Sequence, residues 1–113
     1  MLLLVVVKVL EYVDAQGGIP YRTWIRSLDV TTRARVIATV LRMEGGNFST
    51  AKSVGSGVSE LRLDFGPGYR VYFGRDGERL VILLGGGSKK RQQTDIAEAH
   101  VLWAEYKRRK LEE

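Results

Sequence analysis

One stretch of this 113-residue chain, residues 60–73, holds the side chains best suited to chemistry, because charged and aromatic side chains alternate there with apolar ones. The alternation on both sides of the Gly-Pro-Gly sequence at 66–68 predicts a β-hairpin with one apolar and one charged face. A symmetric turn would place Asp64 opposite Arg70 and Arg62 opposite Tyr72. Two guanidinium groups, a phenol and a carboxylate would then share one rigid surface.

This surface carries groups that could bind RNA. The two arginines offer planar donor groups that suit phosphate oxygens, and the ring of Tyr72 offers a surface on which a nucleobase can stack. Lys52 and Lys89, expected on loops at either side, would add positive charge. Attack by the 2′-hydroxyl of the RNA itself would need these groups to align the reactants, but no metal ion.

A structural interpretation competes with this one. Asp64 and Arg70 would then form a surface ion pair worth about 0–1 kcal/mol, and Tyr72 would pack across the strands. Glu60 is interpreted as an exposed strand carboxylate, with a role as base beside Arg62 as the alternative. The remaining candidates also have structural interpretations: His100 as a half-buried or surface residue, and Trp24 and Trp103 as core residues.

The composition narrows the function classes. Eighteen Lys and Arg residues against 13 Asp and Glu residues give a net charge of +5, which favours a polyanionic partner. The chain has no cysteine and one histidine, so disulfides, thiol nucleophiles, zinc–thiolate sites and histidine metal cages are not expected. The apolar start, residues 1–7, lacks a basic segment before it and a cleavage site after it, and it is too short to span a bilayer. We therefore expect a cytoplasmic protein with no membrane partner.

The first half of the chain predicts a strand followed by two helices. The apolar run Leu2–Tyr12 predicts a strand, and Pro20 stands where a helix would begin. Asp29 is expected to cap a second helix that ends at Gly45-Gly46. Residues 48–57, which include Lys52, predict a polar loop or a short edge segment. The residues expected on the apolar faces of the two helices are Tyr21, Trp24, Ile25 and Leu28, and Val30, Ala34, Ile37 and Leu41.

The second half predicts three antiparallel strands and a final helix. A turn is expected at residues 75–78, and the apolar run Leu80–Leu84 predicts a central strand covered on both faces. The glycine-rich residues 85–93 are expected to break the sheet, and Thr94 to cap the last helix. The basic run at residues 107–110 is expected to fray. These elements predict a single α+β domain, residues 1–113, in the order β-α-α-β-β-β-α, with a small antiparallel sheet packed by a helix hairpin and a C-terminal helix.

Several segments between about residues 21 and 106 resemble, in consistent order, the RelE/ParE toxin superfamily and its HigB-like branch, the addiction module killer proteins. The matching segments are residues 24–28, 33–36, 44–47, 52–64, 66–72 and 86–89, together with Gln92, residues 95–96 and residues 102–103. The resemblance implies the RelE-like fold, with the same element order as the periodicity.

The resemblance also implies a function. Such proteins are toxins of type II toxin–antitoxin systems that typically cleave mRNA on the ribosome, without metal or other cofactor, and are held inactive by a cognate antitoxin. The antitoxin is expected to be a helix-turn-helix DNA-binding protein, through which alone the toxin would contact DNA. The expected catalytic residues are Arg62, Arg70, Lys89 and Asp95, and the expected RNA-binding residues are Lys52, Tyr72, Lys90 and Arg91.

The functional residues of the family match this sequence to different degrees. Arg70, in the Gly-Tyr-Arg sequence, transfers best, as the arginine that contacts the scissile phosphate. Ser88 stands where most close relatives have an aspartate. Two alternatives therefore stay open: a ParE-like toxin that poisons gyrase, and an inactive toxin that only binds its antitoxin.

Overall fold

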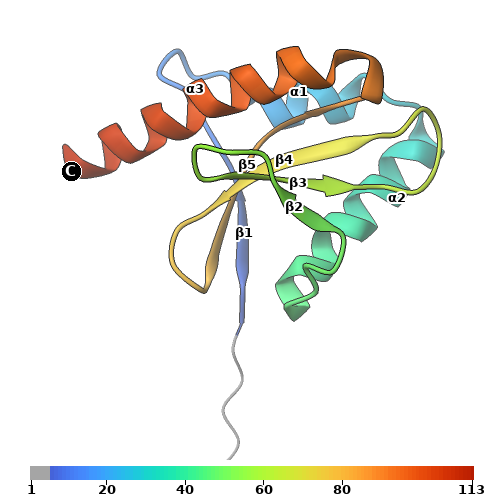
Figure 1. Cartoon of the computed structure of the whole chain (residues 1–113), viewed down its shortest axis with the longest axis horizontal. Coiled ribbons are helices and arrows are strands. Elements are labelled where there is room, and N and C mark those ends of the chain that lie inside the picture. The colour runs from blue at the N-terminus through green and yellow to red at the C-terminus, as the bar shows by residue number, and fades with distance from the viewer. Residues whose placement is uncertain (1–5) are drawn as a thin grey trace, which may run out of the picture.

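The computed structural model describes residues 6–113 and shows an α+β domain with three helices and a five-stranded sheet (Figure 1). Its helices and strands are β1 (Lys8–Glu11), α1 (Pro20–Arg26), α2 (Val30–Leu41), β2 (Ala51–Ser53), β3 (Val58–Arg62), β4 (Arg70–Arg75), β5 (Leu80–Gly87) and α3 (Gln92–Leu111). Short 3-10 turns, Arg42–Gly45 and Lys89–Arg91, follow α2 and precede α3. The helix hairpin and the C-terminal helix are therefore confirmed, and β2 is a short edge strand.

The strands lie in the order β1-β5-β4-β3-β2, and β1 pairs in parallel with β5. The sheet is therefore mixed, and the prediction of an antiparallel sheet was wrong for this strand. Apolar alternation indicates which face a residue occupies, but it carries no information on strand direction. The predicted strand Leu2–Tyr12 is shorter in the structure, and its first four residues lie outside the described part of the chain.

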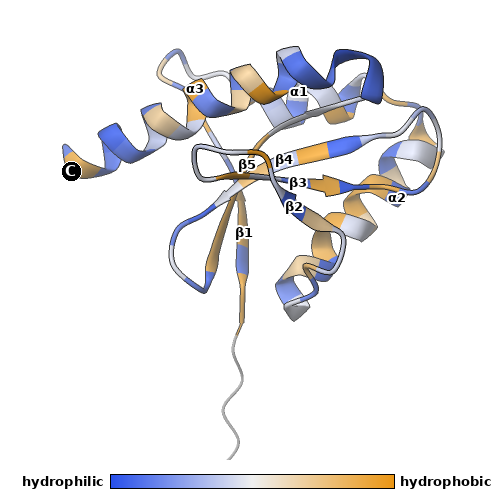
Figure 2. Ribbon diagram, in the orientation of Figure 1, coloured by the Kyte–Doolittle hydropathy of each residue, from blue (hydrophilic) through white to orange (hydrophobic). Residues whose placement is uncertain are grey.

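Each face of the sheet has its own apolar core. Leu61, Val71 and Phe73 pack with α1 and α2 on one face, whereas Tyr72 packs with α3 on the other. The strand β5 contributes alternate residues to both cores, so the prediction of a central strand covered on both faces is confirmed. Figure 2 shows hydrophobic residues along the strands and alternating hydrophilic and hydrophobic ones along α3. Within residues 6–113, no helix has both the length and the apolar character that a membrane span requires.

The ends of α2 are as predicted, but its buried face is not. The Asp29 side chain accepts a hydrogen bond from the backbone N–H of Thr32, and Gly46 adopts a φ of +84° after the 3-10 turn. The buried residues of the helix are Val36 and Val40, which continue to Met43. Three of the four residues expected in the core are exposed large apolar side chains: Val30 (76%), Ile37 (39%) and Leu41 (50%).

The glycine-rich segment does not break the sheet, since β5 extends through Gly87. The glycines are needed because other side chains lie directly on the strand. A Cβ at Gly86 would collide with the ring of Trp24 from α1, and a Cβ at Gly87 would collide with the carboxylate of Asp95 from α3. This part of β5 therefore allows helices on opposite sides of the sheet to approach the backbone closely.

The last helix differs from the prediction at both ends. It begins at Gln92 rather than after Thr94, because the 3-10 turn already directs the chain into the helix. The basic run at its end is helical rather than frayed, and two of its four residues are paired. Lys110 Nζ lies 2.5 Å from Asp76 Oδ2, and Arg109 Nη1 donates to the Tyr12 hydroxyl at 3.0 Å. These contacts connect the end of α3 to the β4–β5 turn and to the residue after β1.

Candidate functional site

The central hairpin has a different register from the predicted one. Arg62 lies opposite Arg70, and Glu60 lies opposite Tyr72. The predicted pairs of Asp64 with Arg70 and of Arg62 with Tyr72 are therefore wrong. The last bond across the hairpin runs from the backbone N–H of residue 63 to the carbonyl of residue 69, so the connecting loop is wider than three residues. Since the register differs by two residues, every side chain stays on its predicted face.

The charged face of this hairpin is covered by α3 instead of being open to solvent. Arg70 is 5% exposed, Glu60 3% and Tyr72 1%. Tyr72 belongs to the core cluster that contains Ala99 and Trp103 of α3, because the apolar side of this helix is buried against this face of the sheet. Stacking of a base on Tyr72 is therefore excluded in this structure, and the interpretation of Glu60 as an exposed carboxylate was wrong.

Arg70 is held by two groups at its guanidinium, and a third group holds one of these two. Glu60 Oε2 lies 3.5 Å from its Nε, and its Nη1 donates to the carbonyl oxygen of Gly68 at 2.6 Å. Gln92, in the first turn of α3, donates from Nε2 to the same Glu60 oxygen at 3.0 Å. A buried charge needs such partners, because removing it from water without them costs several kcal/mol. The network therefore fixes the orientation of Arg70.

Two more of the predicted catalytic residues lie beside Arg70. Arg62 is its cross-strand neighbour, and its side chain is exposed. Lys89 approaches from the end of β5, where its backbone N–H donates to the carbonyl of Pro67 at 3.3 Å. A Cβ placed on Gly68 would lie 3.2 Å from both Arg70 Nη1 and Lys89 Cβ, so these two residues enclose the glycine. Three cations thus gather at the tip of the β3–β4 hairpin, and we call this group of Arg62, Arg70 and Lys89 the hairpin-tip cluster.

Asp95 lies next to this cluster but deeper in the molecule. It sits above Gly87, the β5 partner of Arg70, and its side chain is 11% exposed. Its Oδ2 atom is buried with no hydrogen-bond partner in the described chain. Burial raises the pKa of Asp95, against the attraction of Arg91, whose Nε lies 3.9 Å from Oδ1. A carboxyl with a raised pKa holds its proton at a higher pH than an exposed aspartate does.

The Tyr72 hydroxyl and Arg70 Nε are the two other buried side-chain polar atoms without a hydrogen-bond partner in the described chain. Burial, followed by the negative charges of Glu60 and Asp95, raises the pKa of Tyr72 to about 12. Tyr72 and Asp95 both line a cleft of about 570 Å³ between α1, the end of β5 and α3. A Cβ at Gly85 would have no atom within 4 Å, so the cleft has room above the strand. The cleft therefore has a mixed lining, in which Asp95 is joined by Asp14, Glu98 and the cation Arg91, and the hairpin-tip cluster lies outside it.

The remaining predicted residues occupy the surroundings. Lys52 is exposed on β2 opposite Glu60, and Lys90 is exposed on the 3-10 turn before α3. Arg91 is exposed and pairs with Asp95. His100 is half-buried, as predicted, and its Nε2 lies 3.0 Å from the backbone oxygen of residue 54.

Sequence reasoning missed the structural role of Glu60 and Gln92. The spacing of Glu60, two residues before Arg62 on the same strand face, was the available signal. No local pattern connects Gln92 with Glu60, because the contact is between residues 32 positions apart. The resulting arrangement can hold an anion such as a phosphate at the hairpin-tip cluster, with Asp95 as a nearby carboxyl.

Comparisons with known proteins identify a family. A family model described as phage derived protein Gp49-like (DUF891) matches residues 23–107. An uncharacterized protein of Haemophilus influenzae (strain ATCC 51907 / DSM 11121 / KW20 / Rd) is 41% identical over 91 residues, which cover 80% of this chain and 92% of the relative. No solved structure matches the chain significantly. The matched region contains the second half of α1, the whole of α2 and of β2 to β5, and most of α3, and the chain therefore belongs to the Gp49-like family of phage-derived proteins.

Proposed function

We propose that this protein is the toxin of a type II toxin–antitoxin system, with a RelE-like fold of the HigB-like branch, and that it cleaves mRNA on the ribosome in the cytoplasm. The observation that carries this proposal is the hairpin-tip cluster, in which Arg70 is oriented by Glu60 and Gln92 while Arg62 and Lys89 flank it. The resemblance of the segments around Arg70 to that branch supports the same proposal.

The reaction follows from the chemistry of RNA. The 2′-oxygen attacks the adjacent phosphorus and loses its proton, the bond from phosphorus to the 5′-oxygen breaks, and that oxygen gains a proton. The products are a 2′,3′-cyclic phosphate and a 5′-hydroxyl. Arg70, Arg62 and Lys89 would stabilise the charge that develops on the phosphate oxygens. Asp95, whose pKa is raised by burial, would protonate the leaving oxygen.

Mapping the 5′ ends of cellular mRNA after expression of the protein tests this activity. The native chain is expected to produce new 5′-hydroxyl ends within translated regions. Arg62→Gln, which removes an exposed charge, is expected to lower the cleavage rate about 10²-fold or more, since single donors to a developing oxyanion have effects of this size. Arg79→Gln serves as the matched control, because this arginine is also exposed but lies in the β4–β5 turn.

Arg70 needs a second readout, because it is buried and its loss can unfold the chain. Arg70→Lys retains the charge while it removes the forked donor, and circular dichroism reports whether the fold survives. Unchanged cleavage by a folded Arg70→Lys variant would contradict the role of Arg70. The absence of new mRNA ends with the native chain would contradict the activity itself.

The proposed partners are mRNA on the ribosome and a cognate antitoxin, a helix-turn-helix protein through which the toxin would reach DNA. A binding-only role is the second candidate, because Arg70 and Tyr72 are buried and Ser88 stands at the position of the expected aspartate. Antitoxin binding without growth arrest would favour that candidate. DNA breakage with intact mRNA would instead favour a toxin that poisons gyrase.

A further inference from the structure

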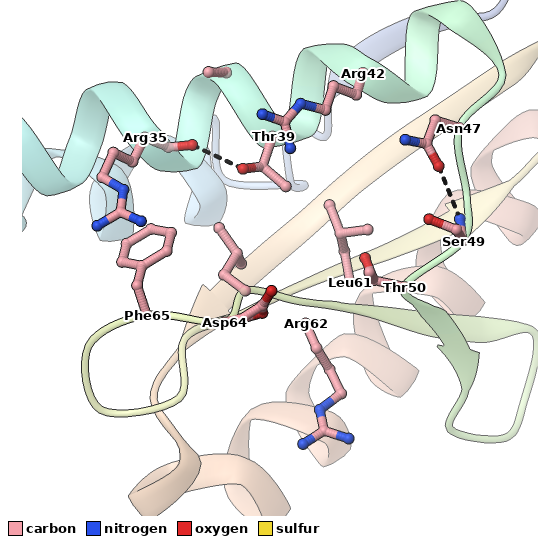
Figure 3. A pocket seen from close by; sticks show the side chains of 12 residues that line it. Arg35, Thr39, Arg42, Asn47, Ser49, Thr50, Leu61, Arg62, Asp64 and Phe65 are labelled. Atoms are coloured by element: carbon pink, nitrogen blue, oxygen red, sulfur yellow. Dashed lines mark hydrogen bonds between the residues drawn. The ribbon is translucent and has the colours of Figure 1, made fainter.

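A second cationic region lies on the opposite side of the hairpin from Arg70. It is a groove of about 290 Å³ between α2 and the end of β3 with the loop after it. Figure 3 shows Arg35 and Thr39 of α2 along one wall, together with Arg42 of the 3-10 turn that follows, and Asp64 and Phe65 on the other. We call this region the α2 groove. No residue of the hairpin-tip cluster other than Arg62 contributes to its lining.

Arg35 of α2 and Arg42 of the 3-10 turn that follows this helix are free to bind a ligand. The Arg35 guanidinium carbon lies over the Phe65 ring, 3.8 Å from its centroid, and the guanidinium keeps N–H donors that are not used in this contact. Within residues 6–113, neither Arg35 nor Arg42 has an ion pair or a side-chain hydrogen bond. Asp64 is the one acidic residue among the lining residues, so the groove keeps a positive charge.

The other lining groups suit a polar occupant. Asn47 accepts a hydrogen bond from the backbone N–H of Ser49 at 3.1 Å, which leaves its amide N–H donors directed elsewhere. The apolar residues Leu61 and Leu63 at the base of the groove are 2% and 5% exposed, so they offer almost no apolar surface. A peptide partner would need apolar anchors in such a groove, whereas a phosphodiester chain needs cations and hydrogen-bond donors.

Arg62 connects the groove with the hairpin-tip cluster. Its backbone lines the groove, and its N–H lies 3.5 Å from the carbonyl oxygen of Thr50. Its side chain points away from Arg35 and Arg42, toward the face covered by α3 (Figure 3). The same face carries Arg70, its cross-strand neighbour. Cations therefore follow one another around the end of β3, from the α2 groove to the hairpin-tip cluster.

We propose that the α2 groove binds backbone phosphates of single-stranded RNA at nucleotides that flank the phosphate held at the hairpin-tip cluster. This assignment rests on the proposed function for the position of the cleaved bond, but the binding itself can be measured without cleavage. Two phosphates, one for Arg35 and one for Arg42, would account for the free donors.

The test uses the full chain and a fluorescently labelled single-stranded RNA of mixed sequence with 2′-O-methyl groups, which removes the attacking hydroxyl. Fluorescence anisotropy at several salt concentrations gives the affinity and its salt dependence for the native chain and for Arg35→Gln/Arg42→Gln. Each phosphate contact with a single strand contributes about 0.7 to the slope of log K against log salt concentration. Loss of two contacts therefore lowers the magnitude of the slope by about 1.4. If the two chains bind equally well at 1 M salt, the variant then binds about 25-fold more weakly than the native chain at 0.1 M salt.

The matched control is Arg79→Gln/Arg108→Gln, which removes the same charge from two exposed arginines in the β4–β5 turn and near the end of α3. Its binding should match that of the native chain more closely than the groove variant does. Equal losses in the two double variants, or no measurable RNA affinity of the native chain, would overturn the proposal. So would a groove variant that keeps its RNA affinity but no longer binds an acidic antitoxin.

The outcomes separate this inference from the proposed function. A native chain that cleaves mRNA, together with a groove variant that binds and cleaves like it, contradicts the inference alone. A native chain that does not cleave mRNA, together with a groove variant that loses RNA affinity as calculated, contradicts the cleavage activity and supports the inference.

Discussion

Replacing Glu60 by glutamine removes the negative charge that faces Arg70 inside the molecule while it keeps the shape of the side chain. The side chains of this pair are 6% and 4% exposed. Loss of one partner of a buried ion pair costs about 3–5 kcal/mol, because the other charge stays buried without compensation. That is a large part of the total of about 5–15 kcal/mol that is typical of a domain. We therefore expect Glu60→Gln to lower the free energy of unfolding by several kcal/mol.

Glu11→Gln is the control, because Glu11 pairs with Arg22 at the surface. Its Oε2 lies 2.7 Å from Arg22 Nη2, which is shorter than the 3.5 Å of the buried pair, but the two side chains are 44% and 29% exposed. Burial, and not distance, determines how much stability each variant loses, since exposed pairs contribute only about 0–1 kcal/mol. Urea denaturation, monitored by tryptophan fluorescence with the m-value checked for constancy, measures both variants.

The reasoning is refuted if the two variants lose the same stability. A second variant, Glu60→Leu/Arg70→Met, replaces the pair by apolar side chains of similar size. It should be more stable than Glu60→Gln, because it leaves no unpaired charge in the interior. If the double variant is the less stable of the two, the hydrogen bond from Gln92 contributes more than the charge of the pair.

Three further outcomes follow from the structure. Gly86→Ala should cost about 1–3 kcal/mol in urea denaturation because the indole above it must move, whereas Gly85→Ala, with open space above it, should change stability by less than about 1 kcal/mol. Asp95→Asn should stabilise the fold at pH 7 while it abolishes mRNA cleavage. Burial raises the folded-state pKa of this carboxyl, so the native chain loses stability as pH rises through that pKa, whereas the uncharged amide does not. Hydrogen bonds from Lys110 and then from Tyr106 lower the folded-state pKa of Asp76. Asp76 therefore contributes to the free energy of unfolding above its unfolded-state pKa of about 3.9, and this contribution is lost as pH falls through the folded-state pKa. Thermal melts of Asp76→Asn should therefore show a weaker loss of stability below about pH 4 than the native chain does; an unchanged acid profile would contradict this assignment.

The sequence predicted correctly which hairpin residues share a face, but it predicted neither the register of the two strands nor the burial of one face under α3. Leu61 and Val71 lie on one side and Tyr72 on the other, as a period of two requires. The register depends on the width of the connecting loop, which the Gly-Pro-Gly sequence does not determine. The burial of Tyr72 depends on α3, whose residues Ala99 and Trp103 share its core cluster from 27 and 31 positions further along the chain. A local pattern cannot contain that contact.

The error on α2 has a different physical origin. The helix carries two apolar series at helical spacing, one through Ile37 and Leu41 and the other through Val36 and Val40. Spacing alone does not distinguish them. The second series continues to Met43, which is fully buried, so that choice buries one more large side chain under the sheet. Packing of the whole domain therefore determines which face of α2 is buried, whereas the spacing of its apolar residues does not.

The burial of Tyr72 changes where a phosphate would be held. The RNA-binding interpretation of the sequence placed Arg62, Arg70 and Tyr72 of this face in contact with RNA, but α3 covers Tyr72 and Arg70 and leaves only the end of the face open. Inside, burial raises the pKa of Tyr72 to about 12 and also raises the pKa of Asp95, and the positive charge of Arg70 is already paired with Glu60. At the rim, Arg62 and Lys89 are exposed and positive, and Ser88 adds no carboxylate where the resemblance leads one to expect an aspartate. An anion is therefore attracted to the tip of the hairpin and not to the sheet face, and Asp95 is the carboxyl positioned at the boundary between these two environments.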